Sequence, residues 1–204
     1  MHLQEGVLSA PILIAGGLAA AAGTYLGLRQ LNDERLPRVG VMASALFIAS
    51  LVHLPIGVAS VHLVLNGLAG LLLGWAVFPA FLVSLFLQAI LLKFGGLTAL
   101  GVNTVLMAGP GVLMHYVFRR RVMQSSRAAL AGGGAACGLA VMISAGLLFG
   151  ALVATGRGFL LTAEVVLAAH APVAAAEALV GGLCTRYLYA VRPEMLAWKT
   201  EIQR

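Results

Sequence analysis

The sequence has little charge for its length. Only 10% of its 204 residues are charged and 61% are hydrophobic, whereas a soluble domain carries about 25% charged residues. The apolar residues form long runs with small residues throughout, which is typical of a polytopic α-helical membrane protein. The net charge of +6 does not indicate nucleic-acid binding, because the arginines lie in short loops and no basic stripe is interleaved with aromatic residues.

Other absences exclude further classes of protein. The only cysteines, Cys137 and Cys184, both lie in apolar runs, so we interpret them as packing residues rather than as a disulfide or a thiolate site. No Gly-x-x-x-x-Gly-Lys-Ser/Thr loop occurs, so the chain does not bind ATP in the P-loop manner. Residues 1–6 contain no lysine or arginine, unlike the start of a signal peptide, so we expect the first span to remain uncleaved.

The apolar runs predict seven membrane spans in one all-α membrane domain, residues 1–204. The spans are 9–28, 39–53, 63–78, 79–94, 103–118, 128–154 and 163–189. With the N-terminus outside, the cytoplasmic side holds Arg29, Arg35, Arg38, Arg119, Arg120, Arg121, Arg127, Arg186, Arg192, Lys199 and Arg204. Only Lys93 and Arg157 stay outside, so the positive-inside rule predicts an outer N-terminus and a cytoplasmic C-terminus. Gly-x-x-x-Gly pairs at 70/74, 134/138 and 146/150 predict close helix contacts.

Nitrogen donors gather on the predicted outer side. They are the α-amino group of Met1, the imidazole of His2, and the histidines that bound the turn His53–His62. An N-terminal amine, the backbone nitrogen of residue 2 and its imidazole can form fused chelate rings on one metal, and one more imidazole completes a four-nitrogen plane. Such sites suit Ni(II) and Cu(II), and they bind more weakly in mild acid. From these residues alone, a solvated His2, a helix-capping His62 and an interfacial His53 are alternatives to a metal site.

Four motifs, in order along the chain, resemble the CbiM/NikM family, the substrate-binding (S) components of energy-coupling-factor (ECF) transporters for cobalt and nickel. They are Met1-His2-Leu3-Gln4-Glu5-Gly6, Ser60-Val61-His62-Leu63, the block from Gln88-Ala89 through Gly95-Gly96-Leu97-Thr98 to Asn103, and His170-Ala-Pro172 with Glu177 followed by Tyr187 to Arg192-Pro193. The chain departs from the family pattern after Asn103, where members often have a second asparagine and a methionine but this chain reads Thr104-Val105-Leu106-Met107. It also has Ala178 where a glycine usually follows the glutamate.

The resemblance implies a metal site with named ligands. The family's ligands correspond to Met1, His2 and His62, with the N-terminal loop inserted into the outer face of the bundle. Glu5, Asn103 and Asn66 are expected to support these ligands through hydrogen bonds. The cargo is Co²⁺ or Ni²⁺ as transported substrate, with no catalytic cofactor. The motifs of this chain resemble those of the cobalt branch of the family more closely. The coordination preference of a four-nitrogen plane instead favours nickel. Binding of Cu(II) has no support from the family.

The resemblance also implies partners in a prokaryotic plasma membrane. These are a transmembrane coupling (T) subunit, two cytoplasmic ATPase subunits and often a small accessory membrane subunit, with lipid around the chain and no nucleic acid. We interpret His170 and Glu177, which lie seven residues apart, as buried hydrogen-bonding groups and His115 as an interfacial histidine.

Two other classes of protein compete with a transport subunit. An intramembrane hydrolase would use Ser60 and His62, or a His/Glu pair, but no acidic partner accompanies Ser60 and no Gly-x-Ser-x-Gly motif occurs. A passive channel would need a row of pore-lining polar groups, which the sequence lacks.

Overall fold

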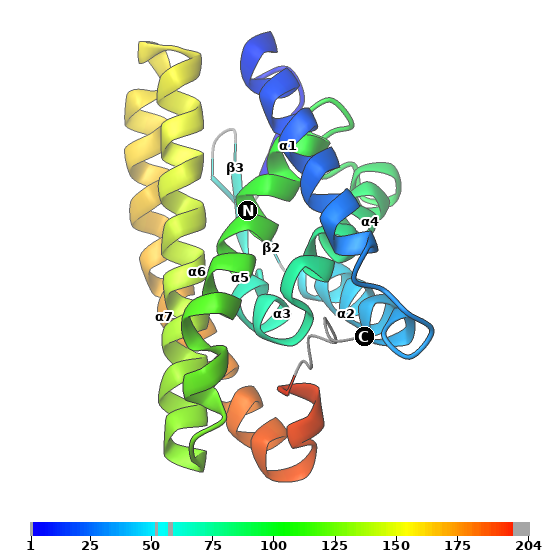
Figure 1. Cartoon of the computed structure of the whole chain (residues 1–204). Coiled ribbons are helices and arrows are strands. Elements are labelled where there is room, and N and C mark those ends of the chain that lie inside the picture. Colours follow the sequence, from blue (N-terminus) through cyan, green and yellow to red (C-terminus); the bar gives the residue numbers. More distant parts are fainter. Residues whose placement is uncertain (1, 52, 57–58, 198–204) are drawn as a thin grey trace.

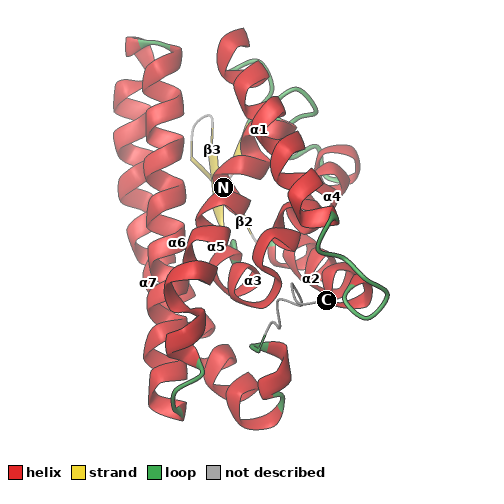
Figure 2. Ribbon diagram, viewed as in Figure 1, coloured by secondary structure: helices red, strands yellow, loops and turns green. Residues whose placement is uncertain are grey.

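The computed structural model describes residues 2–51, 53–56 and 59–197, and in that part of the chain helices dominate (Figures 1 and 2). The α-helices are α1 Ala10–Leu28, α2 Leu36–Ala49, α3 Asn66–Leu73, α4 Val77–Leu91, α5 Leu100–Val122, α6 Ser126–Thr155 and α7 Leu160–Val191. Short 3₁₀ helices lie at η1 Gly74–Ala76, η2 Arg157–Phe159 and η3 Pro193–Met195. Three strands, β1 His2–Leu3, β2 His53–Ile56 and β3 Ala59–His62, form a small sheet in the order β1-β3-β2. The sequence predicted an all-α chain, and the structure adds this three-stranded sheet to the helices.

The prediction of seven long spans is wrong in its third and fourth members. Five helical segments in the described residues are long and apolar enough to cross a membrane, namely Ala10–Leu28, Asn66–Leu91, Leu100–Val122, Ser126–Thr155 and Leu160–Val191. Helix α2 is apolar but has only 14 residues. The stretches predicted as spans 63–78 and 79–94 form one helical segment, so the described part of the chain has five long helices and one shorter helix.

The break in that segment lies at Gly74, not between residues 78 and 79. Gly74 has φ 56° and ψ −129°, a conformation that is open to glycine but costly for other residues. Pro79, beside the predicted boundary, lies in the first turn of α4, where proline is tolerated because its missing N–H is not needed. Leu65, with φ 54°, is the last non-helical residue between β3 and α3. Because Leu65 and Gly74 bound α3, this helix has only eight residues.

Helix α4 runs antiparallel to α1. A Cβ at Gly27, near the end of α1, would lie 2.5 Å from the Trp75 carbonyl oxygen, and one at Gly23 would lie 2.4 Å from the Phe78 ring. At the other end of α4, the Glu5 N–H donates to the Gly95 carbonyl oxygen at 2.9 Å. Glu5 therefore lies beside the link between α4 and α5.

Helices α6 and α7 form a long hairpin with small residues between them. A Cβ at Gly134 would lie 2.8 Å from the Ala178 carbonyl oxygen, and one at Gly138 would lie 3.2 Å from the Ala178 Cβ. Cys137 is fully buried in the same contact, where a Cβ at Gly181 would meet its Sγ at 2.1 Å. The packing roles predicted for Cys137 and for the 134/138 pair are confirmed. A Cβ added at either member of the 146/150 pair would meet no atom within 4 Å, so this pair makes no close helix contact within the described residues.

Replacing Gly70 by alanine should be the costliest single-methyl addition in the bundle. A Cβ at Gly70 would lie 2.0 Å from the carbonyl oxygen of Gly111 and 2.5 Å from its Cα, and backbone atoms cannot move aside as a flexible side chain can. We expect Gly70→Ala to destabilise the fold by about 3 kcal/mol, the upper range for overpacking. Gly146→Ala on α6, where the added methyl meets open space, is the control and should leave the unfolding temperature in detergent unchanged or raised. Equal unfolding temperatures for the two variants would contradict this packing.

Candidate metal site

The N-terminal segment lies inside the bundle as the edge strand of the small sheet. Strand β1 pairs antiparallel with β3, with His2 opposite Ser60 and Leu3 opposite Ala59. Leu3 is 0% exposed. Because the pairing is antiparallel, β1 followed back from Leu3 to His2 approaches the end of β3 that carries His62.

Asn103 clamps the backbone of this segment. Its Oδ1 accepts a hydrogen bond from the Leu3 N–H at 2.9 Å, and its Nδ2 donates to the Leu3 carbonyl oxygen at 3.1 Å. The Asn103 side chain thereby acts as a neighbouring strand would, satisfying both backbone groups of a buried residue. It is itself buried in the first turn of α5, so a long helix fixes its position.

The clamp predicts a loss of cargo affinity in Asn103→Ala. This change leaves the N–H and C=O of Leu3 buried without their partners, at about 1–3 kcal/mol for each group. We expect metal affinity to fall at least tenfold when titrated by calorimetry, because the strand that leads to His2 loses its anchor.

Asn66→Ala is the matched control, because it removes a buried asparagine whose amide bonds lie elsewhere. The Asn66 Nδ2 donates to Ser144 Oγ on α6 at 2.8 Å, and its Oδ1 accepts from the Gly67 N–H at 2.9 Å. The first bond joins α3 to α6 and the second lies within α3, so both described bonds of the Asn66 side chain serve helix packing. Equal loss of affinity in both asparagine variants would contradict a specific role for the clamp.

His62, at the end of β3, is 6% exposed, and its tautomer suits metal binding. Its Nδ1 lies 2.6 Å from the carbonyl oxygen of Leu63. A carbonyl only accepts, so Nδ1 carries the proton and Nε2 carries the lone pair. Metal-binding histidines typically have such an outer hydrogen bond, which orients the ring and raises the basicity of the other nitrogen.

Several predicted ligand groups lie outside what the structure describes. Met1 is outside the described residues, and only the backbone of His2 is described. Among the described side chains, no group of three His, Cys, Asp or Glu residues could hold a metal ion. Of the ligands that the sequence predicts, Met1, His2 and His62, only His62 has a described side chain.

Glu5 is held by its backbone, while its side chain is exposed. The N–H of Glu5 bonds to Gly95, and a Cβ at Gly96 would lie 2.6 Å from the Glu5 Cβ. Gln4, Glu5, Lys93 and residues 95–97 line an open hollow of about 580 Å³ beside the N-terminal segment. Ala89 and Ile90 of α4 complete the lining, which contains no residue of β1.

Sequence reasoning missed the contacts of two ionisable groups on α7. Glu177 is 0% exposed, and its Oε1 accepts hydrogen bonds from the N–H groups of Val64 and Leu65, the latter at 2.8 Å. His170, also fully buried, donates through Nδ1 to the Val166 carbonyl oxygen at 2.6 Å. Within the described residues, the other polar atoms of this pair, Glu177 Oε2 and His170 Nε2, have no hydrogen-bond partner. The one signal in the sequence was an ionisable pair inside a membrane span.

His115 is buried inside the protein, which its interpretation as an interfacial histidine did not predict. It is packed between α3 and α5, with Nδ1 at 3.3 Å from the Leu71 carbonyl oxygen and Arg119 Nη1 at 3.4 Å from Nε2. The His115 ring packs beside Gly74, where α3 ends, and a Cβ at Gly74 would contact this ring at 3.4 Å.

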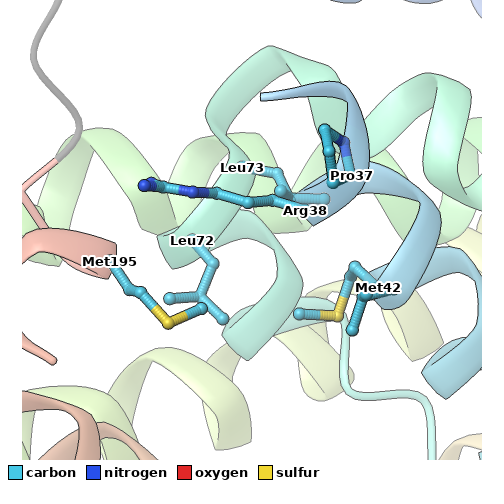
Figure 3. A pocket seen from close by; sticks show the side chains of 7 residues that line it. Pro37, Arg38, Met42, Leu72, Leu73 and Met195 are labelled. Carbon is cyan, nitrogen blue, oxygen red and sulfur yellow. The ribbon is translucent and has the colours of Figure 1, made fainter. Parts of the chain in front are cut away.

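A second hollow, of about 210 Å³, lies beside Arg38 of α2 (Figure 3). Its walls come from α2, α3 and η3, with the Arg38 side chain extended over Leu72 and Leu73 and with Met42 and Met195 on opposite sides. Its lining is apolar apart from Arg38, and it contains no residue of β1 or β3. It is therefore not part of the candidate metal site.

Comparison with known proteins identifies the group to which these features belong. The family model described as "CbiM: Cobalt uptake substrate-specific transmembrane region" matches residues 2–195. A putative metal transport protein of Haemophilus influenzae is 44% identical over 201 residues, covering 96% of this chain and 97% of that protein. A fused nickel transport protein NikMN of Rhodobacter capsulatus is 35% identical over 161 residues, covering 70% of this chain and 46% of that protein. The crystal structure of a truncated transition metal transporter superposes with a TM-score of 0.76 at 23% identity, covering 93% of this chain and 99% of that one, which shows the same fold.

Proposed function

This chain belongs to the CbiM family of cobalt-uptake transmembrane components, and on that premise we propose that it is the substrate-binding (S) subunit of an ECF-type importer for a divalent transition metal. The family is a transport family of multi-pass membrane proteins, not a family of enzymes. The intramembrane hydrolase considered from Ser60 and His62 is therefore set aside.

The observation that supports a cargo site at the N-terminus is the clamp of Leu3 by Asn103. A two-residue strand at the very start of a chain would ordinarily be frayed, because termini are ordered only where they are tied down. Here the strand is paired with β3, and its Leu3 is buried and held by a side chain one hundred residues away. We propose that the Met1 amine, the backbone and imidazole nitrogens of His2, and His62 form a four-nitrogen site at this place.

Cobalt is the proposed cargo, with nickel as the second candidate. The description of the family names cobalt uptake, and the motifs of this chain lie closer to the cobalt branch. The ligand set favours nickel, since a plane of four nitrogens suits Ni(II), and the NikMN relative carries nickel in its name.

The proposed partners are a transmembrane coupling subunit, two cytoplasmic ATPase subunits and a small accessory membrane subunit. The fused NikMN relative supports such an assembly, because it joins a homologue of this chain to a further component in one polypeptide.

The proposed orientation places the arginine-rich end of the bundle in the cytoplasm. In Figure 1 the α5–α6 turn and the end of α7 lie at the bottom of the molecule, and the α1–α2 loop lies in its lower half on the right. These segments contain most of the arginines, and the positive-inside rule assigns such an end to the cytoplasm. The partner ATPases act on that side, whereas the cargo site opens toward the other side.

The experiment that tests this function is metal analysis of the purified protein with its own N-terminus and no tag there. After exposure to equal cobalt and nickel, we expect about one metal ion per chain, whose identity names the preferred cargo. The ion should be lost in His2→Ala and should be released on mild acidification, since an imidazole and an α-amino group protonate near pH 6.5 and 8. A wild-type protein without stoichiometric metal would refute the proposed function.

A further inference from the structure

Glu177 contacts the backbone that carries His62 into the bundle. Val64 and Leu65, whose N–H groups bond to Glu177 Oε1, come directly after the His62–Leu63 pair. The segment ends in the left-handed conformation of Leu65, where α3 begins. The carboxylate thus fixes the point at which the chain turns from β3 into α3, and with it the backbone position of His62.

Its surroundings make Glu177 unusual among the acidic residues of this chain. Within residues 2–51, 53–56 and 59–197 it is the only buried Asp or Glu, and its Oε2 has no hydrogen-bond partner there. Strand β3 and helix α7 are in contact, so this carboxylate lies beside the strand that ends in His62. A buried carboxylate with an unsatisfied oxygen is costly within a membrane bundle, and such groups mark functional positions.

The proposed metal ion and the carboxylate of Glu177 would balance each other's charge. A divalent ion held by nitrogen donors remains positive even where the amide nitrogen of residue 2 loses its proton. Placing that charge inside the bundle is unfavourable unless a negative group lies near it. The clamp residue Asn103 is neutral, and Glu5 is exposed, so neither places a buried negative charge near the ion.

We propose that Glu177 is a positioning residue of the metal site, which holds the His62 segment through the N–H groups of Val64 and Leu65 and offsets the charge of the bound ion. This inference rests on the proposed function. Asn103 and Glu177 then hold the two sides of the site: Asn103 holds the strand with His2, and Glu177 holds the strand with His62.

The alternative is that Glu177 only anchors the start of α3. A carboxylate near a helix N-terminus is stabilising in any protein, with or without a metal. Glu177→Gln separates the two roles, because its amide oxygen can still accept from Val64 and Leu65 while the negative charge is lost. Glu164→Gln is the matched control, being the same change on the same helix at an exposed position.

The test measures cobalt and nickel affinity by calorimetry, the visible absorption bands of bound Ni(II), and the unfolding temperature of the metal-free protein. We expect Glu177→Gln to weaken both metals at least tenfold, with Ni(II) bands and metal-free unfolding temperature like those of the wild type. Glu164→Gln should match the wild type in all three.

Two outcomes would overturn the inference while leaving the proposed function intact. One is a Glu177→Gln protein that binds metal within twofold of the wild type. The other is a metal-free unfolding temperature that falls in step with affinity, which would assign Glu177 to the structure of α3 alone. Glu177→Ala, which removes charge and acceptor together, should shift the Ni(II) bands as well, because His62 is then no longer held. A wild type that binds no metal would instead refute the proposed function itself, and this inference with it.

Discussion

Adding one alanine ahead of Met1 is expected to abolish high-affinity metal binding. In the proposed site the terminal amine is itself a ligand, fused in a chelate ring with the backbone nitrogen of His2. An extra residue converts this amine into an amide, which is no longer a basic donor. The burial of Leu3 and its two bonds to Asn103 fix the register, so β1 cannot slide to present the new terminus instead.

The loss should exceed the 10–100-fold that typically follows removal of a hydrogen-bonding partner of a ligand, because a ligand itself is lost. Calorimetric titration with cobalt and with nickel measures it. The control is the same alanine added after Arg204, which should bind like the wild type. Undiminished binding by the N-terminally extended protein would exclude the amine from the site, and mass spectrometry would confirm that the added residue is retained.

Replacing His62 by alanine should remove the metal as completely. His62 is the one proposed imidazole ligand with a described side chain, and its outer hydrogen bond to Leu63 leaves Nε2 as the donor atom. Without it, three nitrogens from residues 1 and 2 remain, and the fourth position is open to water. We expect metal content after purification to fall from about one ion per chain to near zero, with a metal-free unfolding temperature close to that of the wild type.

His53→Ala is the matched control for this prediction. His53 pairs directly with His62 in the β2–β3 ladder, yet no motif of the family covers it, so metal content near the wild-type value is expected. A metal-free His53→Ala protein would make His53 a ligand and would replace the four-nitrogen plane by a site with a further imidazole. Full occupancy in His62→Ala would remove His62 from the site.

The helices that the sequence predicted well are those whose apolar runs are bounded by charge or glycine. The expected spans 128–154 and 163–189 differ by a few residues from α6 and α7, because a long hydrophobic run must be helical in lipid, where every backbone group needs an internal partner. The same reasoning failed at residues 63–94. Hydropathy is uniform there, and the break depends on the backbone conformation of Gly74 and Leu65, which tertiary contacts with α5 and α7 determine.

The site was predictable where its chemistry is local, and less so where it depends on the fold. Met1 and His2 are adjacent in sequence, so their chelating potential can be read directly. That Asn103 binds Leu3 through both backbone groups, and that Glu177 binds the segment after His62, could not be derived from one sequence, because each contact spans about one hundred residues. The expected support by Asn66 stays a prediction, and nothing in the sequence indicated that its amide donates to Ser144 on α6.

The clamp between Leu3 and Asn103 has a consequence for biosynthesis. The ribosome makes Leu3 first, but its partner on α5 follows one hundred residues later, and Glu177 emerges only near the end of translation. Leu3 therefore remains without its Asn103 partner while the four helices α1 to α4 are synthesised. The proposed cargo site would thus combine the earliest part of the chain with contacts from its last helix, so a nascent protein would acquire metal affinity only when its synthesis is nearly finished.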